Sequence, residues 1–155
     1  MNLLELLKST SEVSPNLKKR GLGLLTELDS ADLPLRVSPR TLFDTQTGIG
    51  TISLAASCYS KDGKKEHNFH LKLAFKKADR IKNFKVRDAQ CSCEDYVYRW
   101  QRANHAAGVC EEAPQELPTD GKPVNPDNIP GMCKHLAALV IAAQNKGLLP
   151  KASQG

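Results

Sequence analysis

The chain has 155 residues, of which 40% are hydrophobic and 25% charged, with 22 Lys and Arg against 17 Asp and Glu. This composition is ordinary for a globular protein and predicts one domain with an appendage. The longest apolar run is far below the roughly 18–20 residues that span a bilayer, and Glu5 stands where a signal peptide carries positive charge. We therefore expect no membrane partner and no secretion signal.

The first residues predict a short helix, because four leucines stand between positions 3 and 7. A second helix is expected after Ser14-Pro15, which offer an N-cap and a proline at the first helical position. Short helices are marginal alone, so this region either covers the domain's own core or docks on a partner. In the docking hypothesis the buried side chains are Leu3, Leu6, Leu7 and Leu24.

Pro34 and Pro39 indicate a linker after this helical arm. Residues 1–36 are therefore predicted to be an N-terminal helical arm and linker, 37–147 the main domain, and 148–155 a tail. Within the domain, alternation of apolar and polar residues over 50–59 and 68–75 predicts two half-buried strands joined at Asp62-Gly63, a type I′ turn signal. A third strand over 84–89, with Phe84 and Val86 inward, leads to Cys91, so the three strands predict an antiparallel meander.

Two pairs of metal-ligating residue types follow this meander: Cys91-Ser-Cys93 and, after 39 residues, Cys133-Lys-His135. In an extended segment, side chains at i and i+2 leave the same face, so the first pair suits a strand end. The second pair suits a helix entrance, because Pro130-Gly131 precede it and apolar residues at helical spacing follow it. Three thiolates and one imidazole predict one tetrahedral, structural Zn²⁺. A Cys-x-Cys disulfide would be strained, and the five cysteines are an odd number, which favours thiolate ligation in a reducing cytoplasm.

Cys91-x-Cys93 and Cys133-x-His135 resemble the SWIM zinc finger over roughly residues 84–146, with a longer gap that carries a proline-rich insertion. This resemblance implies that the first pair ends a β-hairpin and the second opens a helix, and that the partner is nucleic acid or protein. The segments Cys93-Glu-Asp-Tyr-Val-Tyr-Arg-Trp100 and Ile129-Pro-Gly-Met-Cys-Lys-His-Leu136 also look like zinc-binding virion structural proteins of large tailed phages.

Between the pairs, Tyr96, Trp100 and Ala103 form a helical stripe that we expect to pack on the sheet rather than stack nucleobases. Residues 107–130 hold five prolines, so regular structure is unexpected there, and a loop this long is usually functional or a linker. His105 and Cys110 are rival ligands near this loop. Cys58 is expected to be a buried small hydrophobe.

The segment from Lys61 to Arg87 holds ten Lys or Arg against three acidic residues, a local excess of seven. Such a basic hairpin is typical of phosphate-backbone contact, but lysines also protect a sheet edge from aggregation. Residues 107–130 carry five carboxylates, so in a third alternative the basic hairpin of one copy meets this acidic loop of another. The candidate nucleic-acid contacts are Lys64, Lys65, Lys76, Lys77, Lys82, Lys85 and Arg87.

These patterns predict an α+β fold: an antiparallel β-meander followed by a SWIM-like, zinc-clamped helix pair and preceded by a helical arm. We expect a non-enzymatic structural or assembly protein, because four protein ligands leave no open zinc position for chemistry and no small-molecule substrate motif is present. The first hypothesis is a tailed-phage virion component, assembled in the host cytoplasm through contacts with other subunits or with copies of itself. The alternative is a SWIM-type nucleic-acid-binding accessory protein.

Overall fold

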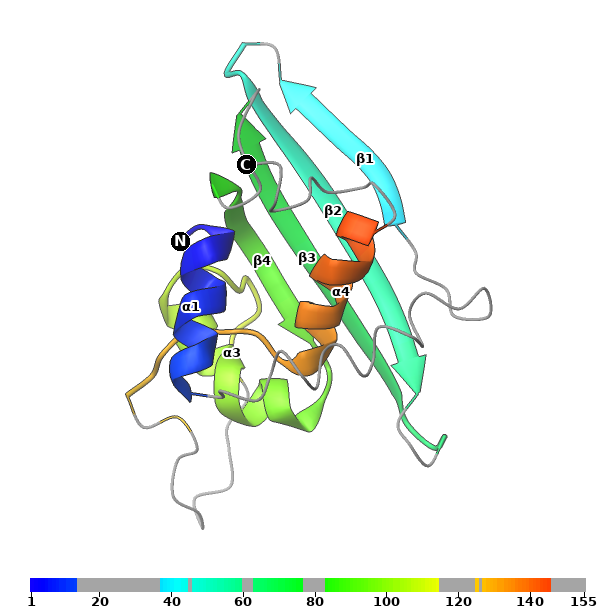
Figure 1. Ribbon diagram of the computed structural model, residues 1–155, viewed down its shortest axis with the longest axis vertical. Helices are drawn as coiled ribbons and strands as arrows, with labels where there is room; N and C mark the ends of the chain where they lie inside the picture. Colours follow the sequence, from blue (N-terminus) through cyan, green and yellow to red (C-terminus); the bar gives the residue numbers. More distant parts are fainter. Residues whose placement is uncertain are drawn as a thin grey trace.

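A computed structural model describes residues 1–13, 37–44, 46–59, 63–76, 83–114, 125 and 127–145, with the backbone path alone given for 37–44. Four antiparallel strands form one sheet in the order β1 (Val37–Asp44), β2 (Ile49–Tyr59), β3 (Glu66–Lys76) and β4 (Lys85–Cys91) (Figure 1). The helices are α1 (Leu3–Val13), a π-helical turn η2 (Tyr96–Trp100) that continues into α3 (Gln101–Ala106), and α4 (Lys134–Asn145). The α+β prediction is confirmed, with one strand more than expected.

Strand β1 corrects the prediction of a linker around Pro39. Its sequence, Val-Ser-Pro-Arg-Thr-Leu-Phe-Asp, does not alternate and contains a proline, so the pattern does not predict a strand. A proline is nevertheless tolerated at a sheet edge or a bulge. The register between β1 and β2 shifts between Ser38 and Leu42, which is where Pro39 stands.

The β2–β3 hairpin follows the predicted register. Tyr59 pairs with Glu66, and pairing continues without a shift to Ile49 and Lys76. This is the register that a two-residue loop at Asp62-Gly63 sets, and Gly63 has the positive φ (71°) that such a turn requires. Because residues 60–62 lie outside the described part, the turn type itself stays a prediction.

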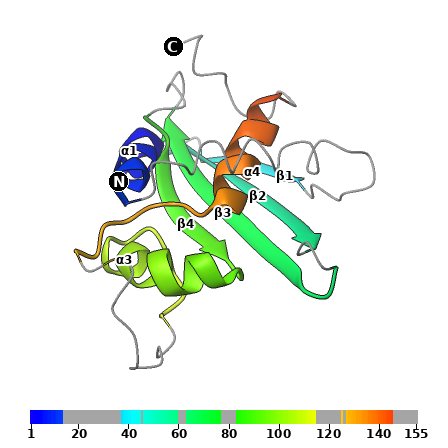
Figure 2. The ribbon, with the colours of Figure 1, turned by 60° about the horizontal axis from the view of Figure 1, so that its bottom comes forward.

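The core lies between the sheet and the helices. Helix α4 crosses one face of the sheet, which we call the front face (Figures 1 and 2). The front-facing side chains of β2, β3 and β4 are buried, as the alternation predicted: Ile52, Leu54, Ala56, Cys58, Phe69, Leu71, Leu73, Val86, Ala89 and Cys91. The opposite, back face carries polar side chains that are only half-buried on β2 and β3, among them Ser53, Ser57, His70 and Lys72.

Helix α1 belongs to this core, which corrects the docking hypothesis for two of its leucines. Leu3 and Leu6 are 2% and 0% exposed in the core cluster, and Leu7 packs against that cluster. The start of the chain also bonds to β4, since Leu3 N–H donates to Phe84 O (2.8 Å) and Val86 N–H donates to Met1 O (3.1 Å). Leu3 and Leu6 therefore cover the domain's own core, while Leu24 lies outside the described residues.

The helical segment after Cys93 packs as expected, with Tyr96, Trp100 and Ala103 buried. It begins with an α-type turn, in which Val97 N–H donates to Cys93 O (3.1 Å), and continues as a π-turn, in which Gln101 N–H donates to Tyr96 O, five residues back. In the described first part of the predicted irregular loop, Val109 O accepts a hydrogen bond from Ala89 N–H (2.8 Å) at the edge of β4. Residues 115–124 and 126 lie outside the described part.

Among the residues that the structure describes, no helix is both long and apolar enough to cross a bilayer.

Candidate metal centre

The structure brings the four predicted ligands together. Cys91 ends β4, Cys93 follows it, and Cys133 directly precedes α4, whose second residue is His135. One donor atom from each residue lies within 4.8 Å of all the others, and the Cys133 Sγ to His135 Nδ1 distance is 4.0 Å. All four side chains are buried, with His135 and Cys93 each 4% exposed. The predicted strand end and helix entrance are both confirmed.

The first pair is set by the end of β4. Cys91 pairs with Phe69 on β3, so its thiol lies on the front face under α4. Ser92 then locks the chain to β3, because its N–H donates to Asn68 O (2.9 Å) while its hydroxyl accepts from Asn68 N–H (2.9 Å). Cys93 Sγ accepts the N–H of Tyr96 (3.3 Å), so the start of the helix faces this sulfur and favours its thiolate.

The second pair is positioned by contacts from α1 and η2 to the residues before it. Met132 N–H donates to Thr10 Oγ1 (2.9 Å), and Ser9 Oγ donates to Pro130 O (2.6 Å). Gly131 lies against the Trp100 ring so closely that an added Cβ would overlap the ring. Ala137 N–H then donates to Cys133 O (3.1 Å) and starts the helix, which returns His135 to the cluster.

The metal-free cluster binds protons unevenly. Burial raises the pKa of Cys133 well above that of an ordinary thiol. Hydrogen bonds from Cys133 and Cys91 lower the pKa of Cys93, which is therefore the thiolate of the group. Burial alone would lower the pKa of His135, but the Cys58, Cys91 and Cys93 thiols outweigh it and raise the pKa to about 11. A metal ion must displace these protons to bind.

The donor set fits a metal ion that prefers sulfur and imidazole. Around one tetrahedral ion with metal–sulfur bonds of about 2.3 Å, neighbouring donors stand roughly 3.8 Å apart. The 4.8 Å limit of this cluster is close to that spacing, and four protein donors complete the coordination. Among the described residues this is the one group of Cys, His, Asp and Glu side chains with such geometry.

Cys58 and His67 lie beside the cluster and are not part of it. They pair across β2 and β3, and the His67 ring centroid is 5.1 Å from that of His135. Cys58 is buried at 3% exposure, and its thiol raises the pKa of His135. The expectation that Cys58 is a buried small side chain is confirmed, with the addition that it contacts the ligand histidine.

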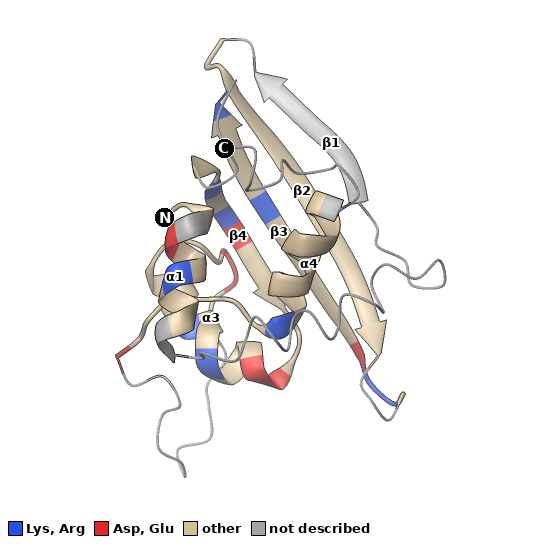
Figure 3. Cartoon of the chain, viewed as in Figure 1, with Lys and Arg blue, Asp and Glu red and all other residues tan. Residues whose placement is uncertain are grey.

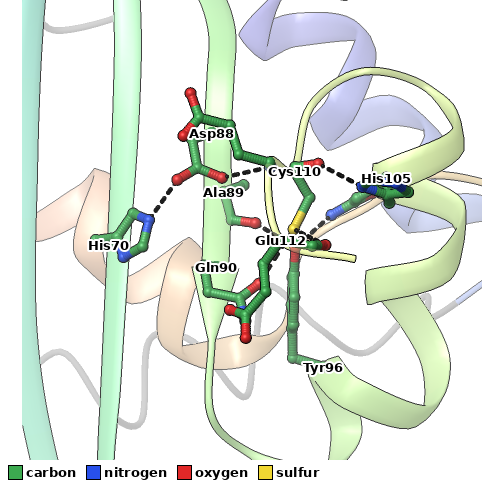
Figure 4. A network of polar contacts seen from close by, with 10 residues as sticks. His70, Asp88, Ala89, Gln90, Tyr96, His105, Cys110 and Glu112 are labelled. Carbon is green, nitrogen blue, oxygen red and sulfur yellow. Dashed lines mark hydrogen bonds and ion pairs between the residues drawn. The ribbon is translucent and has the colours of Figure 1, made fainter. Parts of the chain in front are cut away.

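The rival ligands Cys110 and His105 belong to a different network, which lies beside β4 on the side away from His70 of β3 (Figure 4). Cys110 Sγ donates to Gln90 Oε1 (3.1 Å), and the Cys110 carbonyl lies 3.0 Å from His105 Nδ1. Burial raises the pKa of the Cys110 thiol, which keeps it protonated. Neither residue is therefore a ligand of the four-donor cluster.

The basic residues of the hairpin form two separate groups (Figure 3). One group lies on neighbouring parts of β3 and β4 and contains Lys72, Lys76, Lys85 and Arg87. The other, Lys64 and Lys65, lies next to the β2–β3 turn, where Lys65 pairs with Glu94 (3.5 Å). Lys77 and Lys82 lie outside the described residues. The structure therefore divides the predicted basic surface.

No protein-family model, no curated protein and no solved structure matches this chain in the three comparisons made. The cluster and the surfaces around it are therefore the basis for assigning a function.

Sequence reasoning missed the residues that position the ligands, above all Asn104 and Thr10. Their only signal is a polar residue on the apolar stripe of a helix: Asn104 stands four residues after Trp100, and Thr10 four residues after Leu6.

Proposed function

We propose that this protein is a non-enzymatic structural protein, stabilised by one zinc ion, that acts through protein–protein contacts in a larger assembly. The observation that carries this proposal is the buried group of three thiols and one imidazole. Such a set is typical of structural zinc, whereas catalytic zinc keeps one position for water. A SWIM-type zinc finger is the class that this order of strand end, insertion and helix entrance resembles.

A structural role agrees with where the metal would sit. The ion would join the end of β4 at Cys91 to the start of α4 at Lys134, two elements that are far apart along the chain. Zinc binding of this kind is coupled to folding, so the ion fixes α4 on the sheet and closes the insertion at both ends. The proposed setting, a tailed-phage virion, is supported by the resemblance of the segments around both ligand pairs.

The assembly proposal is tested by size-exclusion chromatography with light scattering on the zinc-loaded chain, alone and with duplex DNA. A self-association or a stable complex with a co-expressed virion subunit, unchanged by added DNA, is the expected result. A monomer that elutes with DNA and binds no protein subunit would contradict it.

The second candidate function is nucleic-acid binding, favoured by Lys72, Lys76, Lys85 and Arg87 on two adjacent strands. Phosphate contacts make affinity fall with salt, with a slope of about 0.9 per phosphate neutralised on duplex DNA. Replacing these four residues with Gln should flatten the slope. The matched control is Lys64→Gln with Lys65→Gln, because those lysines lie at the other end of β3. Equal slopes in both variants would exclude this surface.

A further inference from the structure

A groove of about 640 Å³ lies on the back face of the sheet, behind the metal cluster. Its floor contains the cross-strand row Ala55, His70 and Gln90, which are paired on β2, β3 and β4. Its wall comes from the helical segment that follows Cys93, through Tyr98 and Gln101, and from Glu112. The volume is within the range of roughly 300–1,000 Å³ that is usual for ligand sites.

The groove is negatively charged. Three carboxylates line it, Glu66, Glu94 and Glu112, and no lysine or arginine is among its lining residues. Lys65 does pair with Glu94, but both side chains are largely exposed, at 70% and 77%, so water screens that pair. The three carboxylates do not meet the geometry of a shared metal site, which in the described residues only the Cys and His cluster meets. An organic cation therefore suits the groove better than a metal ion.

One buried acceptor in the wall lacks a donor. Gln101 is 1% exposed, and its Nε2 donates to Ala113 O (3.5 Å), while its Oε1 has no hydrogen-bond partner. A buried polar atom without a partner is unfavourable, and a ligand that donates to it removes that cost. The donors nearby are already engaged: Gln90 Nε2 bonds Glu112 Oε2 (2.6 Å), and His70 Nε2 bonds Asp88 Oδ2 (2.6 Å) (Figure 4).

The groove also offers an aromatic ring. Tyr98 lines the groove and is 45% exposed, so its ring is accessible to a ligand. A planar cation can stack on such a ring while its edge donates hydrogen bonds in the ring's plane. A guanidinium group carries five donors in a fixed fork, enough for the Glu112 carboxylate and the Gln101 amide oxygen together.

From the groove's charge, its buried acceptor and its exposed ring, we infer that it binds an arginine side chain of a partner protein. This inference deepens the proposed function by naming what the groove binds. It rests on the proposed function only for the statement that the arginine belongs to a partner protein. A lysine would match the charge, but it would lack the fork and the planar stacking face.

The test titrates the zinc-loaded, ¹⁵N-labelled full chain with the peptide acetyl-Ala-Arg-Ala-amide and follows the NMR amide signals. The expected result is saturable shifts of the Gln101 and Gln90 side-chain amides and of the Tyr98 backbone amide, with a dissociation constant of about 1 mM. The peptide with citrulline in place of arginine keeps the shape without the charge and should bind at least about tenfold more weakly. The lysine peptide should bind weakly too.

Two variants and one control make the test specific. Glu112→Gln should weaken arginine binding about fivefold, whereas Glu111→Gln should leave it unchanged, because Glu111 is adjacent in sequence and does not line the groove. Gln101→Met removes the unpaired oxygen at similar volume and should also weaken binding. No saturable shift up to about 10 mM peptide, or equal binding of the citrulline peptide, would overturn the inference. Such a failure would not contradict the proposed function, because the zinc content and the assembly state are measured in separate experiments.

Discussion

The side-chain amide of Asn104 binds both backbone groups of Gly131. Gly131 N–H donates to Asn104 Oδ1 (2.9 Å), and Asn104 Nδ2 donates to Gly131 O (2.8 Å) and to the hydroxyl of Tyr96 (3.1 Å). Asn104 is fully buried, so no water replaces these bonds. Because Gly131 stands two residues before Cys133, this contact fixes the second ligand pair relative to the helix that follows the first.

Asn104→Ala should therefore lower both stability and metal affinity. The substitution leaves the buried N–H and C=O of Gly131 without partners, which costs about 1–3 kcal/mol for each unsatisfied group. We expect the free energy of unfolding in urea to fall by about 2–4 kcal/mol. Arg102→Ala, an exposed change on the same helix, is the control and should stay within about 0.5 kcal/mol. Equal stability of the two variants would contradict the role of Asn104.

Gly131→Ala tests the close approach of the backbone to Trp100. The added Cβ would overlap the Trp100 ring and lie 2.8 Å from Thr10 Oγ1, so the ligand segment must shift. Overpacking of this kind costs typically about 1–3 kcal/mol. Trp100→Leu removes the obstacle, and in the double mutant Gly131→Ala should cost much less than in the native background, measured by thermal unfolding. Simple additivity would show that the clash does not exist.

Leu6→Ala should destabilise the whole domain, because Leu6 is 0% exposed in the core rather than held for a partner. A leucine-to-alanine change in a core costs about 2–5 kcal/mol. The matched control is Lys8→Ala on the exposed side of α1, with a change below about 0.5 kcal/mol. Removal of residues 1–13 should unfold the domain by circular dichroism, and a truncated chain that stays folded would restore the docking-arm hypothesis.

Zinc binding should release about three protons at neutral pH, one each from Cys91, Cys133 and His135. The pKa values of Cys133 and His135 are raised in the metal-free chain, and that of Cys91 is raised as well, although its hydrogen bond to Cys133 acts in the opposite direction. Cys93, with its lowered pKa, contributes none. Affinity should therefore increase steeply with pH. Calorimetry in buffers of different ionisation enthalpy counts the protons, and a release of one or none would contradict the four-ligand site.

The sequence predicts much of the site because spacing and periodicity are local. Cys91-x-Cys93 at a strand end and Cys133-x-His135 before an apolar helical stripe determine where the four donors stand along their elements. The hairpin register follows from alternation and from Asp62-Gly63. These features depend on residues close in sequence, so a single chain reveals them.

The missed features depend on contacts between distant residues. The sequence pattern does not predict β1, because Pro39 is a typical linker signal. An edge strand nevertheless tolerates a proline. The sequence pattern of Leu3 and Leu6 is the same whether these side chains cover the domain's own core or dock on a partner protein. Only the contacts with the core and β4 distinguish the two alternatives. Cys110 and His105 have ligand chemistry, but the Cys110 thiol bonds to Gln90, and His105 lies next to the Cys110 carbonyl.

The central claim is that Cys91, Cys93, Cys133 and His135 hold one structural zinc ion, and elemental analysis of the purified chain tests it most directly. We predict about one zinc per chain in the native protein and in Cys110→Ala, whose thiol belongs to the separate network. In Cys133→Ser and in His135→Ala the zinc should be lost, with loosening of residues 91–135 in hydrogen exchange. Full zinc content in both ligand variants, or its loss in Cys110→Ala alone, would contradict the claim.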